Sequence, residues 1–161
     1  MINPEDKLKE MGLYLPEQLV MPEGMKISFP WVHRVENTLF ISCHLAQNND
    51  GTVAGPFGSV GAIVSSGDAK KSARQVGLTI LGSIKREIWN LNKIHQWCRA
   101  FGMVNADPDF KDHPSIINGF TELILEVFGP NVGKHSRSAI GVSSLPLNVC
   151  VEIEAQVLIK S

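Results

Sequence analysis

Residues 149–160 carry the pattern that most constrains the fold of this chain, because apolar side chains occupy every second position. These apolar residues are Val149, Val151, Ile153, Ala155, Val157 and Ile159. Successive side chains of a strand point to opposite faces, so the period of two predicts a long strand with one apolar face. A sheet that contains such a strand must be covered on that face by another layer.

Two segments with helical periodicity supply the predicted layer. The apolar stripe of the first, which starts near Asp68, consists of Ala69, Ala73, Val76, Ile80, Leu81, Ile84 and Ile88. The stripe of the second consists of Ile116, Ile117, Phe120, Leu123, Ile124 and Val127. Spacings of three and four residues are typical of an amphipathic helix. Pro114 suits the first position of the second helix, and Gly129-Pro130 is expected to end it.

Several other segments have the composition of strands. They cover residues 27–35, 38–45, 59–64, 94–106 and 134–142. Glu36-Asn37 predicts a hairpin between the first two, and residues 143–148 are expected to join the last of these strands to the C-terminal strand as a second hairpin. We therefore predict an α+β fold, with a single mixed sheet of about six strands and two helices packed on one face.

The other face of the predicted sheet combines polar and aromatic residues with apolar neighbours. The residues expected there are Ser42, Trp97, Arg99, Arg137 and Glu152. A face of this mixed character is typical of an interface, so we expect another subunit to cover it.

The chain of 161 residues suits one domain with a sizeable core. Residues 1–26 start with a short helical pattern and continue with a proline-punctuated stretch. We interpret them as an N-terminal extension packed on a domain of residues 27–161.

The charged start has no apolar signal segment, and no apolar run reaches the roughly 20 residues of a membrane span. A cytoplasmic protein without a membrane partner is therefore expected.

The charge and the spacing of histidines and cysteines disfavour several classes of partner. A net charge of −1 creates no field that attracts nucleic acid, so a nucleic-acid partner is not expected. The 5 histidines and 3 cysteines show no spacing typical of metal ligands, and we expect no metal and no cofactor.

Arg137 lies in a predicted strand, KHSRSAIGV, where a charged side chain needs an explanation. A buried guanidinium without a partner costs several kcal/mol, because arginine does not lose its proton in a protein. One interpretation is an ion pair with Glu152, if the last two strands form a hairpin. The other is a site for an external carboxylate, whose two oxygens match the guanidinium fork. The residues themselves leave both interpretations open.

The strand 38–45 places a second group of candidates. Its alternation predicts Ser42 and His44 on one face and Cys43 on the other. Ser42 has no visible His-Asp pair to activate it as a nucleophile, so a hydroxyl that binds a ligand or the backbone is the better interpretation. For Cys43, an inert thiol and an oxidation-sensitive thiol remain alternatives.

Separate segments in order resemble the RidA/YjgF family. They are Ser136-Arg137-Ser138, Leu145-Pro146, the acidic segment VEIEA at 151–155, the strand TLFISCHL at 38–45, and FGMVNADPDF at 101–110. The segment LKEMGLYLPE at 8–17 and VFG at 127–129 resemble the longer branch of this family. The resemblance implies a chorismate-mutase-like fold and a homotrimer with clefts between subunits.

The resemblance also implies a function and roles for named residues. Arg137 would bind the carboxylate of a reactive 2-imino acid or its enamine tautomer, and hydrolysis would give a 2-oxo acid and ammonia without metal or organic cofactor. Glu152 would orient the imine nitrogen or the attacking water. Ser42 and the backbone N–H of Cys43 would line the pocket, and the Ala139 carbonyl would position water.

Three positions depart from the family pattern. Cys43 stands where the family has glycine, His44 replaces a glutamine, and Phe29 replaces a tyrosine in the substrate-binding set. These departures motivate an alternative: a non-catalytic trimer that binds small carboxylates or acts in stress response. A third reading, endoribonuclease activity, is disfavoured by the net charge of −1 and by the lack of an aromatic-basic stripe.

Overall fold

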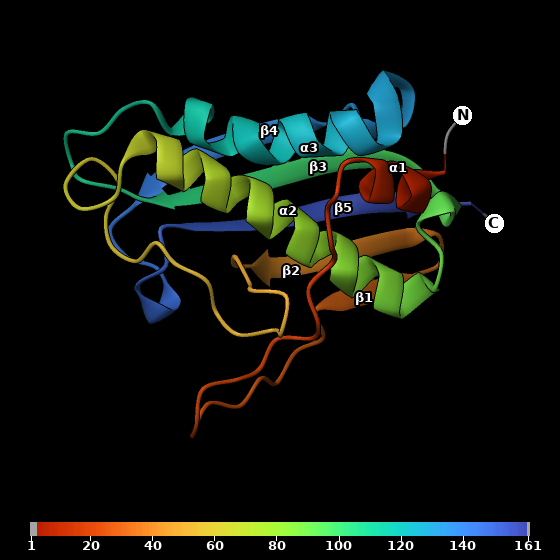
Figure 1. The fold of residues 1–161 in the computed structure, drawn as a ribbon, viewed down its shortest axis with the longest axis horizontal. Helices are drawn as coiled ribbons and strands as arrows, with labels where there is room; N and C mark the ends of the chain where they lie inside the picture. The colour runs from red at the N-terminus through yellow and green to blue at the C-terminus, as the bar shows by residue number, and fades with distance from the viewer. Residues whose placement is uncertain (1–2, 161) are drawn as a thin grey trace.

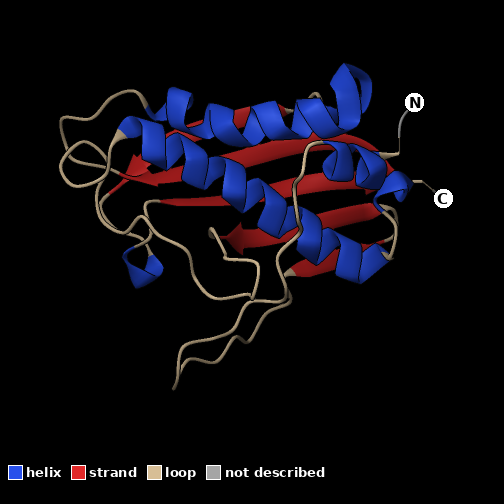
Figure 2. Ribbon diagram, viewed as in Figure 1, coloured by secondary structure: helices blue, strands red, loops and turns tan. Residues whose placement is uncertain are grey.

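The computed structural model describes residues 3–160 as one five-stranded sheet with its two long helices on the same face (Figures 1 and 2). The strands are β1 (Val32–Val35), β2 (Thr38–His44), β3 (Ile94–Asn105), β4 (Ser136–Val142) and β5 (Val151–Ile159). The helices are α1 (Pro4–Glu10), α2 (Ser66–Ile88) and α3 (His113–Gly133), with short 3-10 turns at Leu91–Lys93 and Pro146–Asn148. The predicted α+β class and the single mixed sheet are confirmed.

The sheet has the order β1-β2-β5-β3-β4. β1 and β2 form the expected antiparallel hairpin, in which Val35 pairs with Thr38. β5 lies antiparallel between β2 and β3, and β4 runs parallel to β3 at the edge. The long alternating strand is therefore central, which explains why its apolar residues are almost completely buried.

Two expectations about the sheet are wrong. Residues 59–64 do not form a strand but only isolated bridges through Val60, so the sheet has five strands where about six were expected. β4 and β5 do not form a hairpin, because β3 lies between them. The glycines and turns of residues 58–61 prevent a regular strand there.

Both helical stripes pack on the sheet as predicted. Ser65 caps α2, because its hydroxyl accepts a hydrogen bond from the Asp68 N–H at 3.1 Å. Pro114 occupies the first turn of α3, and Gly129 interrupts this helix with φ 72° and ψ 170°. The core between the layers is apolar, and Trp97 and Phe120 meet in it edge to face at 5.7 Å between ring centroids.

The N-terminal segment lies against α2 and against the loop after β2. Glu17 N–H donates to Asn49 O at 3.0 Å, and Val20 N–H donates to Gly51 O at 2.9 Å. Gly51 has a φ of 84°, and a Cβ there would overlap the Gln18 carbonyl, so this contact requires glycine. The boundary of the extension at residue 26 stays a prediction. No helix in residues 3–160 is long and apolar enough to cross a membrane.

Candidate functional site

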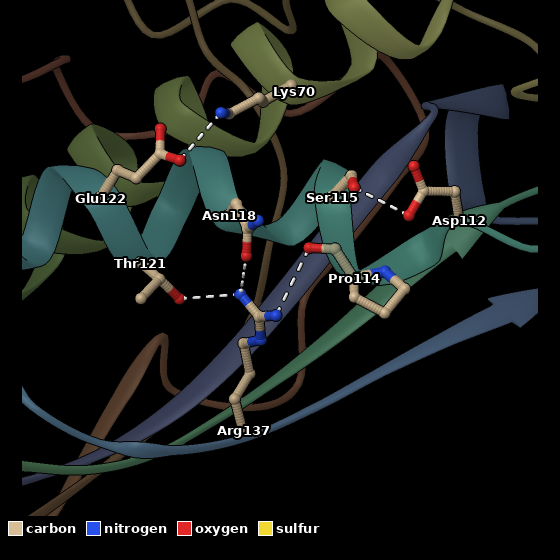
Figure 3. Close-up of polar contacts among 8 residues, drawn as sticks. All are labelled: Lys70, Asp112, Pro114, Ser115, Asn118, Thr121, Glu122 and Arg137. Carbon is tan, nitrogen blue, oxygen red and sulfur yellow. Dashed lines mark hydrogen bonds and ion pairs between the residues drawn. The ribbon is translucent and has the colours of Figure 1, made fainter.

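Arg137 points from β4 toward the first turns of α3 (Figure 3). In the parallel register it pairs with Ala100, a buried residue on the helix-facing side of β3. Its Nη1 donates to Asn118 Oδ1 at 2.8 Å and to Thr121 Oγ1 at 3.1 Å, and its Nη2 donates to the Pro114 carbonyl at 3.4 Å. The guanidinium is thus held in one orientation by the helix.

All three acceptors of this guanidinium are uncharged. Among residues 3–160, no carboxylate forms an ion pair with Arg137, and no acceptor is bonded to its Nε–H. Burial lowers the pKa of Arg137, but an arginine remains charged at neutral pH. The guanidinium is therefore held in place while its positive charge is not neutralised. The parallel N–H groups on its Nε–Nη2 edge match the two oxygens of a carboxylate.

Thr121 is oriented by a histidine on its other side. His135 Nδ1 lies 2.7 Å from the Gly133 carbonyl and therefore carries the proton, which leaves Nε2 as an acceptor. Nε2 lies 3.2 Å from Thr121 Oγ1, so the threonine donates to His135 and accepts from Arg137. Burial, and to a smaller extent the charge of Arg137, lower the pKa of His135, which keeps the ring neutral and this arrangement intact at neutral pH.

Ser42, Cys43 and Glu152 form a second group, on the sheet face that no helix covers. The ladder between β2 and β5 is irregular between Ile41 and His44. This bulge turns Cys43 toward the open face, where its Sγ lies 3.9 Å from Glu154 Oε2. The predicted alternation is wrong at this point, because Ser42 shares the open face with Cys43 while His44 is buried beneath α2.

The open-face group has unusual acid–base properties. Burial raises the pKa of Glu152 to about 7. Burial, followed by the negative charges of Glu152 and Glu154, raises the pKa of Cys43 to about 11. The Cys43 thiol therefore stays protonated at neutral pH, which favours the inert interpretation over a reactive thiolate.

A hollow of about 450 Å³ adjoins this group on the open face. Its polar and charged lining residues are His33, Ser42, Arg99, Glu154 and Gln156. Ser42 Oγ is not free to act as a nucleophile in this arrangement, because it donates to the Pro30 carbonyl at 2.8 Å. Phe29, half exposed, contacts Trp31 edge to face at 5.5 Å between centroids.

Within one chain, Arg137 and Glu152 do not meet. Their strands are separated by β3, and their side chains lie on opposite faces of the sheet. The interpretation of Arg137 as an internal ion pair with Glu152 is therefore wrong. Ala139 lies on β4 near Arg137 and packs against the core, away from the open-face group.

Sequence reasoning missed the acceptors that surround Arg137. Asn118 and Thr121 are polar residues three positions apart on α3, beside the apolar stripe, which places them on one flank of the helix. That spacing was the available signal, but nothing in it identified Arg137 as the partner. Glu154 was also missed as a neighbour of Cys43, because the bulge reverses the expected face. In residues 3–160 no group of three His, Cys, Asp or Glu side chains has the geometry to hold a metal ion.

Comparisons with known proteins agree with this architecture. No family model matches the sequence. The protein TCP17 of Trypanosoma cruzi is 31% identical over 119 residues, which is 74% of this chain and 73% of the relative. The structure of Atu1372 from Agrobacterium tumefaciens, a protein of unknown function, is 32% identical with a TM-score of 0.86, over 98% of this chain and 94% of that one.

A structure from Shewanella oneidensis with a provisional endoribonuclease label is 25% identical with a TM-score of 0.88, over 98% of this chain and all of that one. Two further structures share the fold. The YjgF gene product of E. coli has a TM-score of 0.60 at 16% identity, over 91% of this chain and 98% of that one. RidA from a Psychrobacter species has a TM-score of 0.55 at 22% identity, over 88% of this chain and 94% of that one.

Proposed function

Because this chain belongs to the RidA/YjgF family, we propose that it hydrolyses reactive 2-imino acids, or their enamine tautomers, to 2-oxo acids and ammonia. The observation that carries the proposal is the guanidinium of Arg137, which three uncharged acceptors orient and no carboxylate of residues 3–160 neutralises. A small carboxylate is the ligand that matches its charge and its fork.

The separation of Arg137 from Glu152 supports a site made by two subunits. In one chain the arginine faces α3 at the edge strand, whereas Glu152, Ser42 and Cys43 face the uncovered side of the sheet. In the proposed homotrimer, the open face of one subunit meets the β4 edge of its neighbour. The arginine of one chain and the carboxyl of another then line the same cleft.

The proposed chemistry needs few groups, because an imine carbon is already electrophilic. Arg137 fixes the substrate carboxylate, and a water oxygen forms a bond to C2 while the π electron pair of the C2–N bond moves to nitrogen, which gains a proton as the water loses one. After nitrogen gains a second proton, the C2–N bond breaks, ammonia leaves with the electron pair of that bond, and the C2 hydroxyl loses its proton to become the carbonyl of the 2-oxo acid. Glu152, with a pKa of about 7, is suited to accept a proton from water and return it to nitrogen.

The experiment that tests this proposal generates 2-iminopropanoate or 2-iminobutanoate in situ with a dehydratase and follows the loss of the imine. We expect the protein to accelerate the loss and Arg137→Ala to reduce the acceleration by a hundredfold or more, because the substrate is no longer anchored. Arg137→Lys should restore little of the lost acceleration, since an ammonium lacks the two parallel N–H donors of a guanidinium. Arg34→Ala is the matched control, because within residues 3–160 the side chain of this exposed arginine on β1 bonds only the carbonyl of Glu36, two residues along the chain.

Absence of any acceleration by a correctly assembled protein would contradict the deaminase proposal. The second candidate, a carboxylate-binding trimer without turnover, rests on Cys43, whose side chain contacts Glu154 and remains an uncharged thiol. Calorimetric titration with pyruvate would support it if binding were lost in Arg137→Ala. RNA cleavage that survives in Arg137→Ala would instead place a nuclease activity at another site.

A further inference from the structure

A chain of hydrogen bonds, buried at His44 and Ser83 and exposed at Arg86, connects the N-terminal extension to the open-face group. Arg86 on α2 donates from Nη1 to the Pro16 carbonyl at 3.0 Å and from Nη2 to Ser83 Oγ at 3.0 Å. Ser83 Oγ lies 2.8 Å from His44 Nε2, and His44 Nδ1 lies 2.6 Å from the Ser42 carbonyl. This relay of Arg86, Ser83 and His44 has no part in the proposed chemistry.

The carbonyl acceptors at the two ends of the relay determine which atom carries each of its protons. A carbonyl oxygen only accepts, so His44 carries its proton on Nδ1 and donates to Ser42 O. His44 Nε2 is then an acceptor, and it takes the Ser83 hydroxyl proton, while the lone pairs of Ser83 accept from Arg86. His44 is 3% exposed, and burial lowers its pKa to about 4, so the ring remains neutral and the direction of the relay is kept.

The inner end of the relay lies at the β2 bulge. The regular pairing with β5 stops at Ile41 and resumes at His44, so the backbone of Ser42 and Cys43 lies outside the ladder with β5, although the Ser42 N–H donates to Trp31 O at 3.0 Å on the other side. A bulge leaves backbone groups without their usual partners, and unpaired buried groups are costly. The His44 side chain supplies the donor for the Ser42 carbonyl, which fixes the peptide plane between Ser42 and Cys43 and hence the direction of the Cys43 N–H.

The outer end of the relay depends on close contact between the extension and α2. A Cβ at Gly82 would lie 3.0 Å from the Pro16 carbonyl and 3.4 Å from Arg86 Nη1. Glycine at this position therefore lets the extension approach closely enough to accept from Arg86. Beneath the extension, four buried polar side chains, His44, Gln47, Thr79 and Ser83, line a small cavity of about 10 Å³. The relay thus runs through a polar pocket in an otherwise apolar core.

We propose that His44 is a positioning residue, which transmits the contact between the N-terminal extension and Arg86 to the Ser42–Cys43 peptide of the substrate pocket. This inference rests on the proposed function for its kinetic test, because the pocket role of Ser42 and Cys43 belongs to that proposal. The geometry of the relay itself does not depend on which substrate is used.

Variants of the full chain test the relay at each link. Ser83→Ala and Arg86→Met break the middle and outer links, Gly82→Ala pushes the Pro16 carbonyl away, and His44→Phe removes both imidazole hydrogen bonds. A misplaced binding group costs roughly 10- to 100-fold in rate, so we expect kcat for imine hydrolysis to fall by about tenfold or more in these variants, with a smaller change in KM. His44→Gln should rescue much of the loss, because its amide can donate to Ser42 O and accept from Ser83.

Thr79→Val is the matched control. Thr79 is 1% exposed and lines the same cavity, but within residues 3–160 its hydroxyl donates only to the Gln75 carbonyl of α2. A merely structural role of the buried cluster would make Thr79→Val and Ser83→Ala equivalent in kcat. Equal kcat values in wild type, Ser83→Ala, Arg86→Met and His44→Phe would overturn the proposal.

A readout without substrate separates this proposal from the proposed function. The backbone amide of Cys43, observed by NMR in the assembled protein, should shift and exchange faster with solvent in the relay variants but not in Thr79→Val. If wild type hydrolyses no imine and the Cys43 amide still responds to Arg86→Met, the deaminase assignment fails and the relay stands. If the amide is unchanged in every relay variant, the relay is refuted whatever the activity.

Discussion

At the scale of single residues, neutral partners decide what the charged and titratable groups of this protein do. The positive charge of Arg137 is left uncompensated, because Asn118, Thr121 and the Pro114 carbonyl, which orient the guanidinium, are all uncharged (Figure 3). His44 is the converse case, a titratable group kept uncharged by burial between Ser83 and the Ser42 carbonyl. The first arrangement favours binding of an anion, and the second favours a fixed hydrogen-bond direction.

The buried neutral state of His44 predicts a loss of stability in acid. The pKa of His44 is about 4 in the folded chain and ordinarily 6.5, so between these values the unfolded state binds a proton that the folded state excludes. The contribution of neutral His44 to the free energy of unfolding is fully present above pH 6.5. It decreases as the pH falls toward 4, by about 3 kcal/mol in total.

Urea unfolding of wild type and His44→Gln, at one protein concentration and between pH 4 and 7.5, checks this expectation. Carboxyl groups titrate in both proteins and cancel in the difference between the two curves. The difference in the free energy of unfolding between wild type and His44→Gln should therefore change in favour of His44→Gln as the pH falls. Parallel curves would show that His44 is protonated in the folded protein as readily as in the unfolded one.

At the scale of elements, the close contact between α2 and α3 determines how the helical layer fits the sheet. Gly119 lies on α3 where a Cβ would overlap the Lys70 carbonyl of α2. The ion pairs Lys70–Glu122 at 2.8 Å and Arg74–Glu126 at 2.7 Å bridge the same two helices at the surface, where such pairs contribute little. The spacing of the helices is thus set by glycine rather than by charge.

Gly119→Ala is expected to destabilise the protein by about 2 kcal/mol or more, because the helices must separate to admit one methyl group. Gly67→Ala is its control, since the nearest atom to an added Cβ there is Ser65 Oγ at 3.9 Å. Alanine is favoured over glycine within a helix by up to about 1 kcal/mol, so Gly67→Ala should be neutral or stabilising. Thermal unfolding of the two variants beside wild type measures the contrast, and equal losses in both would contradict the close-contact argument.

At the scale of the whole molecule, the helices of residues 3–160 cover only one face of the sheet (Figure 2). The uncovered face includes Phe40, which is 41% exposed, together with Arg99, Phe101 and Glu154 around the hollow described above. An exposed sheet face of this kind is typical of an interface. The proposed trimer buries it and, in doing so, completes the site.

We therefore expect light scattering after gel filtration to give roughly three times the 17.7 kDa mass of one chain. Phe40→Asp should lower the mass toward that of the monomer, because it places a charge in the proposed interface. Leu125→Asp is the matched control, since Leu125 is 36% exposed on α3, in the opposite layer. A monomeric wild type would remove the basis for a cleft shared between subunits.

The sequence by itself determined the two helices, most of the strands, the α+β class and the candidacy of Arg137. Each of these follows from a local rule: a period of two or 3.6 residues, a proline or glycine at a helix end, or a charge in a predicted strand. For this reason the strand predicted at 149–160 lies within two residues of β5 at each end, and the helix predicted from Pro114 starts one residue earlier, at His113, although it continues past Gly129 to Gly133.

Only the tertiary structure decided the strand order, the face of Cys43 and the surroundings of Arg137. The placement of β3 between β4 and β5 depends on how the whole chain packs, and no local period encodes it. The bulge at Ser42 breaks the alternation that sequence reasoning assumes. Asn118 and Thr121 reach Arg137 across 19 and 16 residues of chain, because the packing of α3 on β3 and β4 brings them together. Local patterns specify elements, whereas long-range packing specifies which polar groups share a site.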